Sequence, residues 1–124
     1  MSIEAHPRPS EEHSRQARHY CDILLPVLRE VARQCGYAIA VHGSLERDID
    51  LVAIPWRDME MTTDYLIDRL HGVVQVVLGP ATLDDAVVKP HGRKAVTMRF
   101  CGHHYIDLSV MPPIATKKQE GDIE

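Results

Sequence analysis

The sequence predicts an α+β domain in which a single mixed or antiparallel sheet carries two or three helices on one face. Three observations lead to this fold class. Apolar residues recur at helical spacing in the first part of the chain, and short apolar runs bounded by Gly, Pro and Asp fill the second half. Only the segment 43–47 joins the first two strand-like runs, which is typical of an antiparallel hairpin.

The length of 124 residues predicts one domain with its own core, over residues 1–124. Residues 1–9 are expected to form a loose arm, residues 10–111 the folded core, and residues 112–124 a charged, flexible tail. The formal charge of −4 gives no overall basic footprint for nucleic acid, although a local basic patch remains compatible with it.

The first helix is expected to begin at Ser10, whose hydroxyl caps it, with Glu11 and Glu12 at the positive end of the helix dipole. Gly36 is a suitable stop. Pro26 removes one backbone donor, so either a kink or two abutting helices are expected there. The residues at helical spacing, which are expected to face the core, are Ala17, Tyr20, Cys21, Leu24, Leu28, Val31, Ala32 and Cys35.

Two strands are expected next, over Tyr37–His42 and Asp48–Pro55, followed by a second helix capped by Asp58 and ended by His71 and Gly72. The apolar positions of that helix include Leu66, Ile67 and Leu70.

Beyond Gly72 every apolar run is strand-like, because β-branched residues dominate and turn signals separate the runs. A tight turn at Cys101-Gly102-His103 is expected between the last two strands. The expected strands are Val73–Gly79, Asp85–Pro90, Lys94–Phe100 and His104–Met111.

The three cysteines predict a reducing, cytoplasmic location. Their number is odd, and Cys21 and Cys35 would lie about 21 Å apart on one continuous helix, too far to bridge. The polar, proline-containing N-terminus is not that of a signal peptide, and no apolar run approaches the length needed to cross a bilayer.

Acidic residues interrupt two of the expected strands. Strand alternation places Asp48 and Asp50 on one side, and it places Asp107 on one face with Tyr105 and Ser109. Asp is depleted in strands, and burying an isolated carboxylate is costly. If the two strands are neighbours, three carboxylates converge, and a divalent cation such as Mg²⁺ (or Mn²⁺) would offset their repulsion.

Two further segments have the composition of phosphate sites. Gly43 allows close backbone approach, and the exposed amides of its loop with the Ser44 hydroxyl could hold a phosphate. Around Gly92 lies the basic cluster of the core, which could hold phosphate oxygens of a nucleotide or nucleic acid, or could simply be a solvated hairpin tip. The residues of this cluster are Lys89, His91, Arg93 and Lys94.

The order of these motifs resembles that of the nucleotidyltransferase superfamily, the DNA polymerase beta-like palm. The order is a strand, Gly-Ser, a strand with Asp-hydrophobic-Asp, and a later strand with a third Asp. The resemblance runs from about Tyr37 to Met111. It implies that Gly43 and Ser44 bind the triphosphate of an incoming nucleotide. It also implies that the catalytic and metal-binding residues are Asp48, Asp50 and Asp107.

The resemblance implies that Asp48 and Asp50 hold two Mg²⁺ ions and that Asp107 helps to activate the attacking hydroxyl. The implied reaction is Mg²⁺-dependent transfer of a nucleoside monophosphate from a nucleoside triphosphate to a hydroxyl acceptor of unknown identity. The chain also resembles small phage-encoded proteins that carry the blocks "HGS", "DLVAIPW" and "YIDLSVMP".

Two alternatives stay open. Only Leu45, Glu46 and Arg47 separate Ser44 from Asp48, whereas superfamily members usually have a longer segment there. This spacing favours a non-catalytic nucleotidyltransferase-like module that binds a nucleotide, nucleic acid or protein, with a partner subunit or a homo-oligomer completing the site. Asp48 could also simply start its strand at the surface beside Arg47.

The histidines suggest a transition-metal site that mixes imidazole and carboxylate ligands, although they show no recognised ligand spacing. His42 precedes Gly43 and is expected to border the acidic patch, as a ligand, a proton carrier or a hydrogen-bonded structural residue. The other histidines considered are His91, His103 and His104, the last two of which face opposite ways in a strand.

Overall fold

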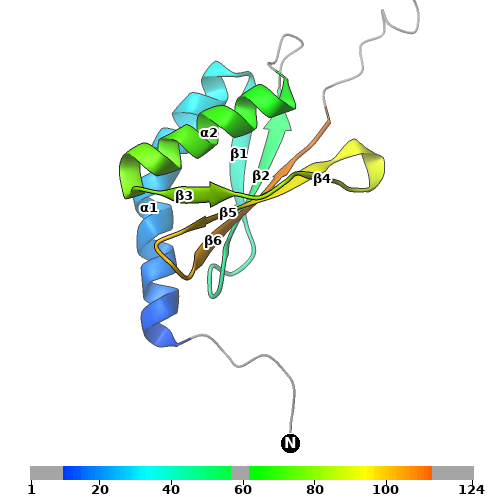
Figure 1. The fold of residues 1–124 in the computed structure, drawn as a ribbon. Coiled ribbons are helices and arrows are strands. Elements are labelled where there is room, and N and C mark those ends of the chain that lie inside the picture. The colour runs from blue at the N-terminus through cyan, green and yellow to red at the C-terminus, as the bar shows by residue number, and fades with distance from the viewer. Residues whose placement is uncertain (1–9, 57–61, 113–124) are drawn as a thin grey trace, which may run out of the picture.

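The computed structural model describes residues 10–56 and 62–112, which form two helices and a six-stranded mixed sheet (Figure 1). The predicted α+β class is confirmed. The helices are α1 (Glu11–Gln34) and α2 (Thr63–Leu78). The strands are β1 (Tyr37–His42), β2 (Ile49–Pro55), β3 (Ala81–Leu83), β4 (Val87–Val88), β5 (Lys94–Phe100) and β6 (His104–Val110), with a 3₁₀ turn at Pro90–Gly92.

Helix α1 begins as predicted. The Ser10 hydroxyl accepts a hydrogen bond from the backbone N–H of His13 at 2.9 Å, and the helix stops before Gly36, which has a φ of +90°. The helix is continuous through Pro26, so the alternative of two abutting helices is wrong. Both Pro26 and Asp22 are exposed, and water can therefore satisfy the Asp22 carbonyl that loses its amide partner.

Helix α2 corrects two predictions. It does not end at His71-Gly72 but runs to Leu78, so the predicted strand Val73–Gly79 is wrong. Burial in this segment follows the helical period of 3.6 residues, because Val74 continues the buried face of the helix whereas Val76 is exposed. A valine-rich run suggested a strand, but burial against the core decided its conformation.

The start of α2 is capped by the Thr62 hydroxyl, which accepts a hydrogen bond from the Tyr65 backbone N–H at 3.1 Å. Asp58, the residue predicted to cap this helix, lies outside the described residues, as do the arm 1–9 and residues 113–124 of the predicted tail. No helix among the described residues is long and apolar enough to cross a membrane.

The strand order is β1-β2-β6-β5-β3, with β4 also paired to β5. The predicted hairpin of β1 and β2 is antiparallel, while β2 and β6 pair in parallel at the centre of the sheet. The predicted strand Asp85–Pro90 shrinks to Val87–Val88, and the short strand Ala81–Leu83 was not predicted. The turn between β5 and β6 is at Cys101-Gly102-His103, as predicted.

Both helices cover the same face of the sheet, and Figure 1 shows them on one side of it. We call this the covered face and the opposite side the open face. Strand residues alternate between the two faces, and those on the covered face enter one hydrophobic core with the helices. The largest buried strand side chains in this core are Tyr37, Ile49, Met98, Phe100, Ile106, Leu108 and Val110.

Candidate functional site

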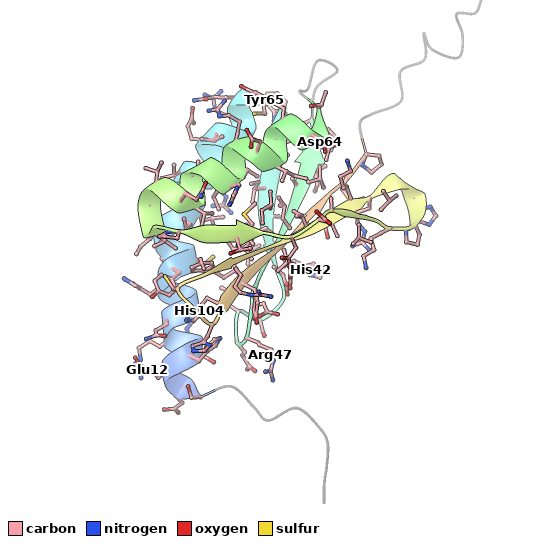
Figure 2. All side chains as sticks on the ribbon, in the orientation of Figure 1. Glu12, His42, Arg47, Asp64, Tyr65 and His104 are labelled. Atoms are coloured by element: carbon pink, nitrogen blue, oxygen red, sulfur yellow. The ribbon has the colours of Figure 1, made fainter. Side chains whose placement is uncertain are left out.

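A row of polar side chains crosses the open face of the sheet over four neighbouring strands. The register pairs His42 with Asp50, Asp50 with Asp107, and Asp107 with Thr97. We call these four residues the polar row. Figure 2 shows His42 on the sheet, at the end of β1 that leads into the loop before β2. Register partners on adjacent strands project to the same side, so the row forms one continuous polar strip.

The two carboxyl groups at the centre of the row interact directly. Burial raises the pKa of Asp50, the charge of Asp107 raises it further, and nearby His42 opposes these effects. A side-chain hydrogen bond between Asp50 and Asp107 also contributes to the raised pKa. The raised pKa of Asp50 therefore reflects burial and the cost of a negative charge beside Asp107.

Asp107 is held from the other side by the neighbouring strand. The Thr97 hydroxyl donates a hydrogen bond of 2.9 Å to Asp107 Oδ1. Sequence reasoning missed Thr97, although alternation in β5 already placed it on the open face with Ala95 and Arg99. The bond fixes the orientation of one carboxyl of the pair.

Asp48 completes the acidic group just before β2 begins. Burial raises the pKa of Asp48, followed by the charges of Asp107 and Asp50, while Arg47 and His13 act in the opposite direction. Its Oδ1 atom is buried and has no hydrogen-bond partner within the part of the chain described. Because an unsatisfied buried acceptor is costly, this oxygen marks a place where a ligand would be stabilising.

The loop that enters β2 touches the acidic group through its glycine. Gly43 has a φ of +84°, and a Cβ built on it would lie 2.9 Å from Asp50 Oδ2. Real Cβ atoms do not approach an oxygen that closely, so the Asp50 carboxylate occupies space that only glycine leaves open. Gly43 is thus in direct contact with the acidic group, an arrangement that the sequence did not predict.

The serine of this loop is partly engaged within the loop itself. Ser44 Oγ accepts a hydrogen bond of 3.3 Å from the Glu46 backbone N–H, and Leu45 between them has a φ of +64°. The Ser44 hydroxyl proton stays available for donation, since the oxygen acts here as an acceptor. The loop is a tight turn with an acidic residue in it, which limits the room for a phosphate.

The start of α1 holds this loop in place. Ser14 Oγ donates a hydrogen bond of 2.8 Å to the Glu46 carbonyl, and His13 Nε2 lies 3.1 Å from the Arg47 carbonyl oxygen. His13 also stacks on His104, with ring centroids 4.2 Å apart and planes at 14°. No sequence spacing signals these contacts, because they join segments that are far apart along the chain.

The basic cluster divides between the two faces. Lys89 and Arg93 line a cavity of about 510 Å³ on the open face, whose wall also includes Thr97, Asp107 and Ser109. The other two predicted residues of the cluster do not line it. His91 is exposed at the 3₁₀ turn with a φ of +67°, and Lys94 lies on the covered face, where it pairs with Asp64 at 2.9 Å.

The three acids lie close together, but they do not form a complete metal-coordination site. Among the described residues, no group of three His, Cys, Asp or Glu side chains is arranged to hold a metal ion as it stands. Mg²⁺ is usually bound by one or two carboxylates together with waters and substrate phosphates. The paired carboxyl groups of Asp50 and Asp107, with the unsatisfied Asp48 oxygen beside them, fit such a partial set of hard oxygen ligands.

For the alternative of a transition-metal site that mixes imidazole and carboxylate ligands, the described residues contain no group of three His, Cys, Asp or Glu side chains that could hold the ion. His104 lies beside α1 (Figure 2) and is buried on the covered face. Its neighbour His103 is exposed. As expected, His42 borders the acidic group, where it lies opposite Asp50.

No protein-family model matches this chain, and no curated protein is similar to it in sequence. Among solved structures, it is similar to a chain in the structure of the GLD-2/RNP-8 complex, with a TM-score of 0.49 and 14% sequence identity. The match covers 83% of this protein and 38% of that chain. A likeness of this size assigns no family, so a functional proposal depends on the site itself.

Proposed function

We propose that the protein is a minimal nucleotidyltransferase, which transfers a nucleoside monophosphate from a nucleoside triphosphate to a hydroxyl acceptor in the presence of Mg²⁺ or Mn²⁺. The observation that carries the proposal is the register of Asp50 and Asp107. They stand side by side on parallel strands of the open face, with Asp48 close enough to raise their electrostatic cost. A chain gains no stability from three neighbouring acids, which supports a role in binding a cation.

Each residue of the site has a chemical role in this proposal. Asp48, Asp50 and Asp107 would hold the divalent ion, which when bound supplies positive charge for the phosphate oxygens. Asp107, oriented by Thr97, is placed to accept the proton of the acceptor hydroxyl. The Gly43 backbone lies against the Asp50 carboxylate, and the Ser44 hydroxyl of the same loop would donate a hydrogen bond to a substrate phosphate.

A second candidate is a non-catalytic module that keeps this fold to bind a nucleotide, a nucleic acid or a protein partner, including a second copy of the chain. The tight loop favours it, because Glu46 would repel a triphosphate and the Ser44 oxygen is already used within the turn. The two candidates share the metal-binding acids and differ in whether transfer follows binding.

The deciding experiment is a calorimetric titration of ATP into the wild type, Asp50→Asn and Asp64→Asn, with and without Mg²⁺. Asp64 is a matched control, because it is an exposed acid whose partner Lys94 lies on the covered face. We expect metal-dependent ATP binding in the wild type and Asp64→Asn, and at least a tenfold loss in Asp50→Asn. Equal, metal-independent binding in all three would reject the proposal.

A transfer assay then separates the two candidates. Labelled nucleoside triphosphates are incubated with the protein, Mg²⁺ and a set of hydroxyl acceptors, and release of pyrophosphate is measured. Release that is lost in Asp107→Asn would support the enzyme. Tight metal-dependent binding without release under any condition would favour the binding module.

A further inference from the structure

Arg93 has no acidic partner among the described residues, although a hydrogen bond orients its side chain. Its Nη1 donates a hydrogen bond of 3.2 Å to Ser109 Oγ on the open face. Within residues 10–56 and 62–112 no carboxylate lies within ion-pair distance of it, whereas Lys94, the next residue, pairs with Asp64. A guanidinium has five N–H donors, so Arg93 keeps donors available after the bond to Ser109.

The cavity that Arg93 lines has charges of opposite sign at different positions along β5. Asp84 is level with the polar row, because its backbone N–H donates to the Thr97 carbonyl at 3.0 Å. Arg93 and Lys89 lie toward the other end, where the Lys89 N–H donates to the Arg93 carbonyl at 2.6 Å. Four residue steps of extended chain separate the backbones of Thr97 and Arg93, which corresponds to about 13 Å, and the Arg93 side chain reaches Ser109 on β6.

We propose that this cavity binds the acceptor substrate and that the acceptor carries a phosphate group, which Arg93 and Lys89 hold. This inference rests on the proposed nucleotidyltransferase function, of which it names the acceptor class. Arg presents two parallel donors to a phosphate and Lys adds a point charge. The acids Asp84 and Asp85 repel a phosphate from the opposite end, which favours the orientation that places the acceptor's phosphate at Arg93.

That orientation places the acceptor hydroxyl at the polar row. The hydroxyl oxygen would form a bond to the α-phosphorus of the nucleoside triphosphate, and the bond from that phosphorus to the β-phosphate bridging oxygen would break. Pyrophosphate leaves, and the hydroxyl proton passes to Asp107. A mononucleotide and the 3′ end of a single-stranded nucleic acid both offer a hydroxyl and a phosphate on one molecule.

The test is a metal-free titration followed by NMR, with EDTA present and with adenosine, AMP and the dinucleotide TpT as probes. AMP is expected to bind at least tenfold more tightly than adenosine and to shift the Arg93 Nε–Hε signal. Arg93→Gln should weaken AMP binding at least tenfold, because a charge-assisted bond is lost. Lys94→Gln, one residue away on the covered face, should bind AMP as the wild type does.

Equal binding of AMP and adenosine would overturn the inference, and so would equal effects of Arg93→Gln and Lys94→Gln. Tighter binding of TpT than of AMP would support a nucleic-acid end, and the reverse order a mononucleotide. If Arg93→Gln fails to fold, Arg93→Lys is used, which keeps the charge and loses the paired donors.

The experiment also separates this inference from the proposed function, because it contains no divalent ion. If AMP binds through Arg93 in EDTA while Mg²⁺-dependent ATP binding is absent, the transfer function fails and the phosphate site stands. If ATP binds with Mg²⁺ and AMP does not use Arg93, the acceptor assignment is wrong while the proposed function holds. Asp64→Asn, which alters an exposed acid outside the site, should leave AMP binding within about twofold of the wild type.

Discussion

The two faces of the sheet are built from alternate residues of the same strands, yet they serve different purposes. In β2, Ile49 and Leu51 pack under the helices, whereas Asp50 between them points to the open face. The covered face holds the apolar core, and the open face holds repelling acids and a cavity with charged walls. Stability and chemistry are therefore separated by one residue step along each strand, and substitutions can address one without the other.

The largest expected effect is a core truncation. Leu108→Ala on β6 should lower the free energy of unfolding by about 2–5 kcal/mol, because the side chain is fully buried among helix and strand residues. Urea unfolding followed by circular dichroism measures it. Ser109→Ala, the adjacent residue on the open face, should change stability by less than about 1 kcal/mol. Similar losses in both variants would remove the distinction between the faces.

A smaller loss of stability is expected for Gly43→Ala. The new Cβ would both disfavour the positive φ at this position and clash with Asp50 Oδ2. The left-handed conformation alone costs a residue with a Cβ about 1–2 kcal/mol. Gly102→Ala, with a φ of +82° and open space around the new atom, isolates that cost. Thermal unfolding of both variants should show a larger loss for Gly43→Ala, and an equal loss would mean that the contact with Asp50 is unimportant.

Asp50 on the open face predicts a contribution to stability that falls as the pH rises. The folded-state pKa of Asp50 lies above its ordinary value of 3.8. Between those two values the folded state binds more protons than the unfolded state, so the free energy of unfolding declines with increasing pH. Asp50→Asn should therefore raise the melting temperature of the metal-free protein at neutral pH. Mg²⁺ should raise the melting temperature of the wild type by binding its folded state, and should not raise that of Asp50→Asn.

The covered face predicts the opposite pH dependence through His104. Burial lowers the pKa of His104, and the nearby imidazoles of His13 and His103 lower it further. Its stabilising contribution is complete above the ordinary value of 6.5 and is lost as the pH falls toward the folded-state pKa. His104→Phe should make unfolding less sensitive to acid. An unchanged acid limb of the stability curve in this variant would contradict the assignment.

The smallest expected effect is Ser14→Ala, which removes the hydrogen bond from α1 to the Glu46 carbonyl. The expected loss of stability is about 0.5–1 kcal/mol, because the bond is exposed. Amide hydrogen exchange of residues 43–47 should become faster. Glu12→Gln, which weakens an exposed ion pair with Arg15 on the same helix, is the control and should leave that exchange unchanged.

The sequence carried much of the local information about fold and site. Alternation placed Asp48 and Asp50 on one side, and the hairpin of β1 and β2 followed from the length of its loop. The Val-rich end of α2 was misread, because β-branched residues satisfy a strand pattern until burial selects the helical period. The sequence did not predict that β2 pairs with β6, because pairing between distant segments leaves no local signal. The convergence of the three acids therefore depended on the assumption that the two strands are neighbours.

Local sequence patterns also did not predict two other features of the site. These are the contacts from α1 that hold the loop before β2, and the division of the basic cluster between the two faces. Ser14 on α1 bonds to the Glu46 carbonyl, and Lys94 on β5 pairs with Asp64 on α2. The roles of the acids, the identity of the divalent ion, the cytoplasmic location and the resemblance to phage-encoded proteins stay predictions, because the fold does not test them.

The parallel pairing of β2 with β6 also has a consequence for folding. Asp50 enters the chain early and Asp107 near its end, so their contact has a large sequence separation and forms slowly. Until β6 docks, the β1–β2 hairpin and the strands around β5 have no shared edge. The acidic centre therefore depends on β6 lying between the two halves of the sheet. A chain that ends before His104 would expose two open sheet edges and would depend on chaperones to avoid aggregation.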